Sequence, residues 1–210
     1  MGKIRSGPGP FKNYRQLARR LTREGRLALP RPERCGVCRR DCGFVKDGHY
    51  FRDFVFRHTV VSDAGVQRYL CKDPEGGTFS ALGAFQEPRA HYTVQLRGAV
   101  LDRIFLKGRS HCAALRDLRR SRGSAMLARS TVWEWCRRFR RQAGGHAAAL
   151  SAHLAQRMPA PHVSIRGDPV LFLRAARAAF GLYLEWSPER FWEWLHDLLF
   201  RAAGRHLLSA

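Results

Sequence analysis

The chain has 210 residues, 45% of them hydrophobic, and a formal net charge of +21. This length and composition are sufficient for a buried core, which excludes a disordered tail. The sequence shows no secretory signal, and no apolar run without charges reaches the roughly 18 residues that a membrane span needs. We therefore expect a cytoplasmic protein, associated with the nucleoid, and no membrane partner.

The positive charge is concentrated in two segments and comes almost entirely from arginine. Residues 1–34 hold ten basic and two acidic side chains, a net +8, and residues 103–145 hold twelve and two, a net +10. Localised positive charge attracts polyanions, and each neutralised phosphate releases counterions. Nucleic acid is therefore the expected partner; an arginine-rich surface without a partner and an anionic membrane are the alternatives.

Changes in composition and periodicity divide the chain into four parts. Residues 1–30 read as a basic arm with a short amphipathic helix, and residues 31–90 as a zinc-ribbon-like module with a β-hairpin. Residues 91–143 have the pattern of a helix-turn-helix, and residues 144–210 that of a helical tail that packs or dimerises. The expected fold class is α+β, mostly α, with the hairpin module preceding the helices.

The hairpin is predicted from aromatic and β-branched residues between positions 50 and 61, which are typical of strands. We expect a turn at Asp63-Ala64-Gly65 and a returning strand from Val66 to Leu70. From Thr93 onward the spacing becomes helical. We expect one helix from Thr93 to a stop at Gly108 and a second that begins after Ser110.

The cysteine spacing predicts a structural Zn²⁺ site. Cys35 and Cys38 form a C-x-x-C knuckle, and Cys71 lies at the end of the predicted hairpin. The position expected for a fourth cysteine holds Pro74, which cannot bind a metal. The other candidates for the fourth ligand are Cys42, which we favour, and His49, His58, Asp73 and Glu75. We expect Cys112 and Cys136 to be buried or partly buried thiols outside the site.

A third helix is predicted from Thr131, which forms a capping box with Glu134, to about Gln142. Val132, Trp135, Cys136 and Phe139 recur at the spacing of one buried face. The opposite face of the segment Arg129–Arg141 is basic, which suits a recognition helix in the major groove of duplex DNA. The residues expected to read bases are Ser130, Trp133 and Arg137. Those expected to contact phosphates are Arg129, Arg138, Arg140 and Arg141.

Residues 31–142 resemble bacterial transposase-like proteins of insertion sequences, a family with an N-terminal zinc ribbon and a helix-turn-helix, many of whose members are known only as a domain of unknown function. The resemblance rests on residues 31–38, on Tyr69-Leu70-Cys71-Lys72-Asp73 followed by Gly77-Thr78-Phe79-Ser80, on Gly108-Arg109-Ser110 and on Arg129-Ser130-Thr131-Val132. It implies a DNA-binding protein of transposon origin. The chain departs from the family pattern by lacking the last cysteine and by a long stretch from Leu118 to Ser130.

The sequence does not show the three carboxylates of a ribonuclease-H-like catalytic domain, so we expect a protein that is not itself an enzyme. No small-molecule substrate is evident from the sequence. The tail is expected to present an apolar side and to pack or dimerise. Two other functions remain open. One is a transposase subunit whose catalytic part lies in a partner or a missing segment, and the other is a basic zinc-ribbon protein that binds RNA.

Overall fold

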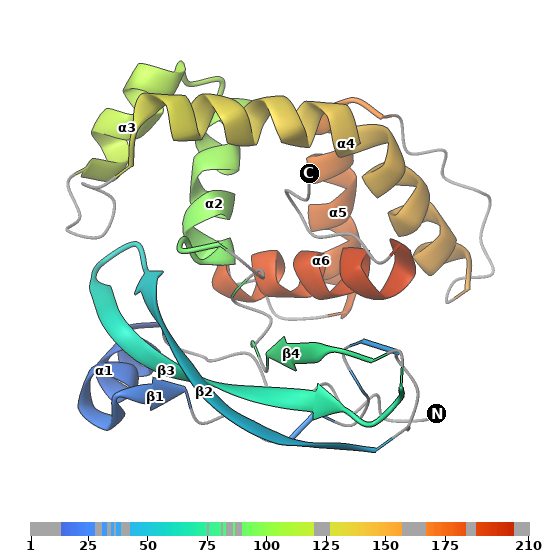
Figure 1. The fold of residues 1–210 in the computed structure, drawn as a ribbon. Helices are drawn as coiled ribbons and strands as arrows, with labels where there is room; N and C mark the ends of the chain where they lie inside the picture. The colour runs from blue at the N-terminus through green and yellow to red at the C-terminus, as the bar shows by residue number, and fades with distance from the viewer. Residues whose placement is uncertain are drawn as a thin grey trace.

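The fold is of the α+β class and mostly helical (Figure 1). The computed structural model describes residues 14–27, 31–32, 35, 37–38, 43–74, 76–80, 82, 86, 90–119, 127–156, 167–183 and 188–203. A long β-hairpin lies on one side of the molecule and a group of helices on the other. Within the described residues, no helix is long and apolar enough to cross a membrane.

The sheet is built on two long antiparallel strands, β2 (Phe44–Val55) and β3 (Val60–Cys71). The short strand β1 (Arg26–Leu27) pairs in parallel with β3, and β4 (Thr78–Ser80) pairs with β3 in the antiparallel sense. Because β2 and β3 pair over most of their length, Phe44 at the start of one strand lies opposite Cys71 at the end of the other.

The predicted turn at residues 63–65 is wrong. The chain turns between Phe56 and Thr59, where the Phe56 N–H donates to the Thr59 carbonyl at 2.9 Å. Asp63 instead lies within β3 with a positive φ of 51°, beside an irregularity in the pairing between Arg52 and Phe54 on β2. The Asp-Ala-Gly signal therefore marks an irregular point in a continuous strand, because local turn chemistry suits a β-bulge as well as a hairpin loop.

Helix α1 (Tyr14–Glu24) packs on the sheet through Leu17, Ala18 and Leu21, all buried. These side chains meet Phe54 and Phe56, among others, in one apolar cluster. The exposed face of α1 is basic. A basic helix in the first part of the chain agrees with the sequence pattern, and its apolar face is covered by the protein's own hairpin.

The helical part contains α2 (Val94–Leu101), the π-helix η1 (Asp102–Leu106), α3 (His111–Arg119), α4 (Arg129–Ala155), α5 (Pro169–Tyr183) and α6 (Pro188–Ala203). Thr93 caps α2 by accepting from the Leu96 N–H, and Ser110 accepts from the Ala113 N–H at the start of α3. The expected helix starts at Thr93 and after Ser110 are thus confirmed.

Helix α4 is longer than predicted and begins earlier. Its N-cap is Ala128, and Glu134 does not form a capping box with Thr131. The helix continues through Gly144 and Gly145 to Ala155, so the boundary expected between residues 143 and 144 falls inside it. Buried side chains on both sides of the glycine pair, including Ala143 and Ala147, outweigh the low helix propensity of glycine. Figure 1 shows that α4 bends part way along, as helices do at glycine pairs.

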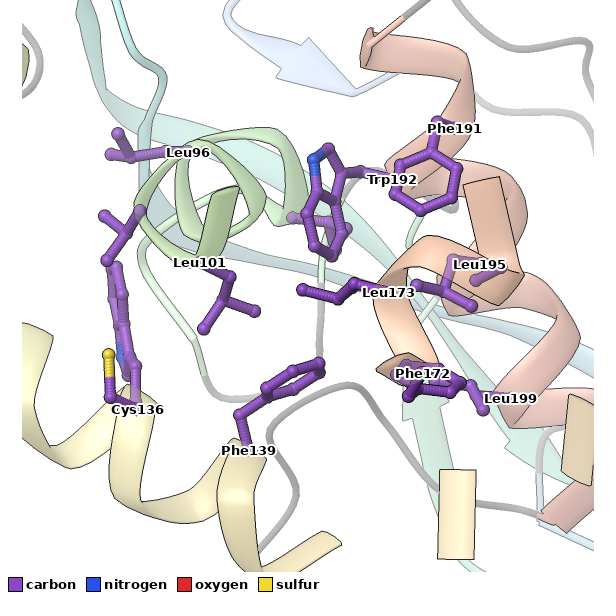
Figure 2. Packing of buried hydrophobic residues seen from close by; sticks show 14 of the residues in the cluster. Leu96, Leu101, Cys136, Phe139, Phe172, Leu173, Phe191, Trp192, Leu195 and Leu199 are labelled. Atoms are coloured by element: carbon purple, nitrogen blue, oxygen red, sulfur yellow. The ribbon is translucent and has the colours of Figure 1, made fainter. Parts of the chain in front are cut away.

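One large apolar core joins α2, α4, α5 and α6 (Figure 2). The tail contributes side chains that the sequence placed on its apolar side; those buried are Phe172, Phe180, Phe191, Leu195, Leu198 and Leu199. The same core includes Val55 at the end of β2, whose N–H and carbonyl bond to the His91 carbonyl and the Thr93 N–H. The hairpin is therefore attached to the helices immediately before α2.

Candidate metal site and nucleic-acid interface

Three cysteines from two distant segments meet at the open end of the hairpin, away from its turn. The Sγ atoms of Cys35, Cys38 and Cys71 all lie within 4.8 Å of one another. Cys38 Sγ and Cys71 Sγ are 3.9 Å apart, and neither is in a disulfide. Two sulfurs bound to one zinc at about 2.3 Å each in a tetrahedron stand about 3.8 Å apart. The spacing of the thiols therefore fits a single zinc ion.

The surroundings of Cys35 favour the thiolate form that a metal needs. Burial raises the pKa of the Cys35 thiol, but the backbone N–H groups of Cys38 and Val37 and the two neighbouring thiols lower it to about 7. The Val37 N–H donates to Cys35 Sγ at 3.4 Å. Thiolates are the metal-binding form of cysteine, so this lowered pKa favours metal binding by Cys35.

Gly76 makes room for the sulfur of Cys71. A Cβ at Gly76 would lie 2.7 Å from Cys71 Sγ and 2.7 Å from the Asp73 carbonyl oxygen, whereas a Cβ at Gly77 would meet nothing within 4 Å. The Gly76 N–H donates to the Asp73 carbonyl at 2.7 Å, which closes a tight turn after Cys71. The turn includes Pro74, the position at which the sequence pattern would place a fourth cysteine.

An aromatic cluster supports the cysteines from inside the module. The rings of Phe44, Tyr69 and Phe79 lie 5.3–5.5 Å apart, and they pack in one cluster with Cys35 and Cys71. The guanidinium of Arg31 covers Phe44 at 4.6 Å from its centroid. The module is therefore held by its own small core as well as by any metal.

No fourth ligand joins the three cysteines among the residues that the structure describes. Within the part of the chain that the structure describes, His49, His58 and Asp73 do not join the three cysteines. Cys42 and Glu75, the other candidates from the sequence, lie outside the described residues. Cys136 is buried in the helical core, where burial raises its pKa to about 11, while Cys112 is exposed on α3, contrary to the prediction.

Helix α4 has the two faces that the sequence predicted. Val132, Trp135, Cys136 and Phe139 are buried, and the outward face carries most of the expected DNA-binding side chains. Those exposed are Arg129, Ser130, Trp133, Arg137, Arg140 and Arg141, and Arg138 is half-buried. Their spacing of three and four residues places them along one side of the helix, so α4 presents a continuous basic stripe.

Glu134, which was expected in a capping box with Thr131, instead binds two of the arginines. Its carboxylate accepts from Arg137 at 2.8 and 3.0 Å and from Arg138 at 2.7 Å. These bonds lower the pKa of Glu134 to about 2. The i, i+3 and i, i+4 spacing was visible in the sequence and is the signal that should have identified these pairs.

Two of the exposed arginines lie over aromatic rings. The Arg137 guanidinium is 5.3 Å from the ring centroid of Trp133, which is 52% exposed, and Arg140 is 5.2 Å from that of Phe105 on η1. Such contacts hold the guanidinium in place at the surface. The stripe is therefore partly preorganised.

Positive charge gathers where α3, α4 and η1 approach one another. Burial and the charges of Arg140 and Arg129 lower the pKa of His111 at the start of α3. Burial and the charge of Arg57, at the turn of the hairpin, lower the pKa of Arg103 on η1. The hairpin turn thus adds a cation to the same side of the molecule.

Comparison with known proteins gave no match: no protein-family model matches the chain, and no curated protein or solved structure matches it. The resemblance to transposase-like proteins stays a prediction from the motifs.

Proposed function

We propose that this protein binds double-stranded DNA through the basic stripe of α4, as a non-catalytic protein of transposon origin. The observation that carries the proposal is the two-faced character of α4: an apolar face fixed in the core and an outward face with four exposed arginines and an exposed tryptophan. A helix anchored in this way can enter the major groove without losing its packing.

Charge supports nucleic acid as the partner. Residues 103–145 carry a net +10, and Arg129 and Arg140 lie close enough to His111 to lower its pKa. The arginine stripe offers planar donors that match phosphates and the edge of guanine. The proposed phosphate contacts are Arg129, Arg138, Arg140 and Arg141, and the proposed base contacts are Ser130, Trp133 and Arg137.

We propose that the cysteine module holds one structural Zn²⁺, bound by Cys35, Cys38 and Cys71, with Cys42 as the fourth ligand. Structural zinc stabilises a fold that a small core holds only weakly. In this chain the zinc would stabilise the open end of the β2–β3 hairpin. The turn of that hairpin places Arg57 near the helices.

The proposal is tested by equilibrium binding to a pool of DNA duplexes across a salt series. Arg141→Gln should weaken binding to every duplex alike, because a phosphate contact carries no sequence information. Arg174→Gln on the exposed side of α5 removes the same charge and should leave affinity unchanged. Equal effects of the two substitutions would show that α4 is not the interface.

A second candidate function is binding to single-stranded RNA. It is favoured by Phe51 on β2, which is 69% exposed and could stack on a base. Phe51→Ala should then weaken binding to single strands by about tenfold, since stacking on one base is worth about 1–3 kcal/mol. A preference for duplex that Phe51→Ala does not change rejects this candidate.

A further inference from the structure

Helix α1 carries a second basic face, separate from the stripe on α4. Its sequence contains four arginines and one glutamate. Among its side chains that the structure describes, Arg19, Arg20 and Arg23 are exposed. Residues 1–13, which precede the helix, contain three basic residues and no acidic one. This end of the chain therefore attracts polyanions independently of α4.

The hairpin holds the basic face of α1 in a fixed orientation. On the other side of the helix, Leu17, Ala18 and Leu21 are buried against a cluster that includes Phe54 and Phe56. The arginines therefore face away from the sheet. The same packing argues against an anionic membrane as the partner, because an amphipathic helix binds a membrane through its apolar face. In α1 that face is already covered by the protein itself.

The ion pairs within α1 do not neutralise its exposed arginines. Arg20 and Arg23 share one acceptor, the Glu24 carboxylate, at 2.9 and 3.2 Å. Both guanidinium groups are largely exposed, and solvent screens such pairs, so a phosphate can replace the carboxylate at little cost. Arg19 lies one turn before Arg23 and adds a third exposed guanidinium. Three cations against one carboxylate leave the described part of this face positive.

The sheet separates α1 from the helical part of the molecule. Phe54 on β2 packs with α1, whereas the next residue, Val55, belongs to the core that joins the helices. Successive side chains of a strand point to opposite faces of the sheet. Helix α1 and the helical part therefore cover opposite faces of the hairpin near its turn. Figure 1 shows the same separation, with α1 beside β1 and β3, and α4 on the far side of the helical part.

We propose that the arginine face of α1 binds the phosphate backbone of a second DNA duplex while α4 holds the first. The inference rests on the proposed binding of DNA by α4 and extends it to a protein that joins two duplex segments. Duplex DNA is stiff over about 150 base pairs, so a short duplex held by α4 does not curve round the molecule to α1. Arginines that contact only phosphates accept any sequence, so the second duplex needs no particular site.

The test is a bridging assay with two short duplexes. One duplex is immobilised on beads, the other carries a fluorescent label, and the protein is added at increasing concentration. Arg19→Gln/Arg23→Gln removes two charges from α1. Both positions are exposed and glutamine is a good helix former, so the variant should fold, which thermal melting checks. Lys46→Gln/Arg174→Gln removes the same charge from exposed positions on β2 and α5 and is the matched control.

The wild type and the control should retain the labelled duplex on the beads. Arg19→Gln/Arg23→Gln should retain about tenfold less of it, since two phosphate contacts are lost, while its affinity for a single free duplex stays within about twofold of the wild type. No bridging by the wild type overturns the inference. Bridging that survives Arg19→Gln/Arg23→Gln also overturns it, because two associated copies would then hold the two duplexes. An equal loss of bridging and of single-duplex affinity overturns it as well, because α1 and α4 would then contact the same duplex.

The proposed role of α4 is judged separately by Arg140→Gln/Arg141→Gln. If this variant binds a single duplex more weakly than the wild type does, and the wild type does not bridge, only the inference about α1 fails. If it binds a single duplex as the wild type does, α4 is not the interface, and the second-duplex assignment of α1 falls with it.

Discussion

Gly98 on α2 lies directly beneath the indole of Trp192 on α6, and no larger residue fits there. A Cβ at Gly98 would overlap the Trp192 ring, which is fully buried. Figure 2 shows the indole of Trp192 directed from α6 toward α2. The contact fixes α2, which precedes the candidate DNA-binding helices, against α6.

Gly98→Ala should therefore lower the free energy of unfolding by roughly 2–3 kcal/mol, because an overfilled core forces neighbours from their positions. Gly181→Ala on α5 is the matched control. Its Cβ would meet nothing within 4 Å, so the helix should gain roughly 0.5–1 kcal/mol. Denaturant unfolding of the two variants checks the pair, and equal destabilisation would show that the Trp192 contact is not the cause.

Gly76→Ala should lower the affinity for metal by about 10–100-fold, the range seen when the surroundings of a ligand are disturbed. The added methyl group would displace the Cys71 sulfur. Gly77→Ala, one residue on, should bind metal as the wild type does. Titration with Co²⁺, followed through its thiolate absorption bands, measures both. A Gly76→Ala protein with unchanged Co²⁺ affinity and spectrum would contradict the three-cysteine site.

Glu134→Gln should strengthen binding to duplex DNA by about threefold, since it releases Arg137 and Arg138 from their exposed ion pairs with the Glu134 carboxylate. Asp47→Asn, which breaks the pair with Arg68 on the hairpin and raises the net charge equally, is the control.

The gain from Glu134→Gln should be the same at pH 5 and pH 8. The pKa of Glu134 lies near 2, so the carboxylate is ionised throughout this range. Its ion pairs are fully present above the ordinary pKa of 4.5 and are lost only as the pH falls toward 2. A gain that disappears at pH 5, or one matched by Asp47→Asn, would reject the competition between Glu134 and DNA.

His111 should take up a proton when DNA binds. In the free protein, burial and the charges of Arg140 and Arg129 lower its pKa below the ordinary value of 6.5. Phosphates that neutralise these arginines should raise that pKa, so affinity should increase as the pH falls through the range between the free and bound values. NMR titration of the His111 ring with and without a duplex measures the shift; identical curves would place the DNA elsewhere.

Much of this arrangement was predictable from local pattern. The buried face of α4, the starts of α2 and α3, and the approach of Cys35, Cys38 and Cys71 follow from spacing and capping residues. The helix features depend on residues that are close in sequence. The approach of the cysteines depends on a hairpin whose two strands pair over most of their length.

Other features depend on tertiary packing that spacing does not reveal. The third helix was predicted to end at about Gln142, before the Gly144-Gly145 pair, but the packing of Ala143 and Ala147 carries α4 through that pair. The Asp63 signal was assigned to a turn because a β-bulge uses the same residue types. The burial of Arg97 on α2, which is only 7% exposed, was not predicted, because nothing in the local sequence distinguishes an arginine that another helix covers.

The most direct test of DNA binding by α4 is the slope of log affinity against log salt for a duplex. Four phosphate contacts, from Arg129, Arg138, Arg140 and Arg141, give a slope of about −3.6. Replacing Arg140 and Arg141 together by glutamine should bring it to about −1.8. A slope unchanged by the double substitution, or no measurable binding of the wild type at low salt, would contradict the proposed interface.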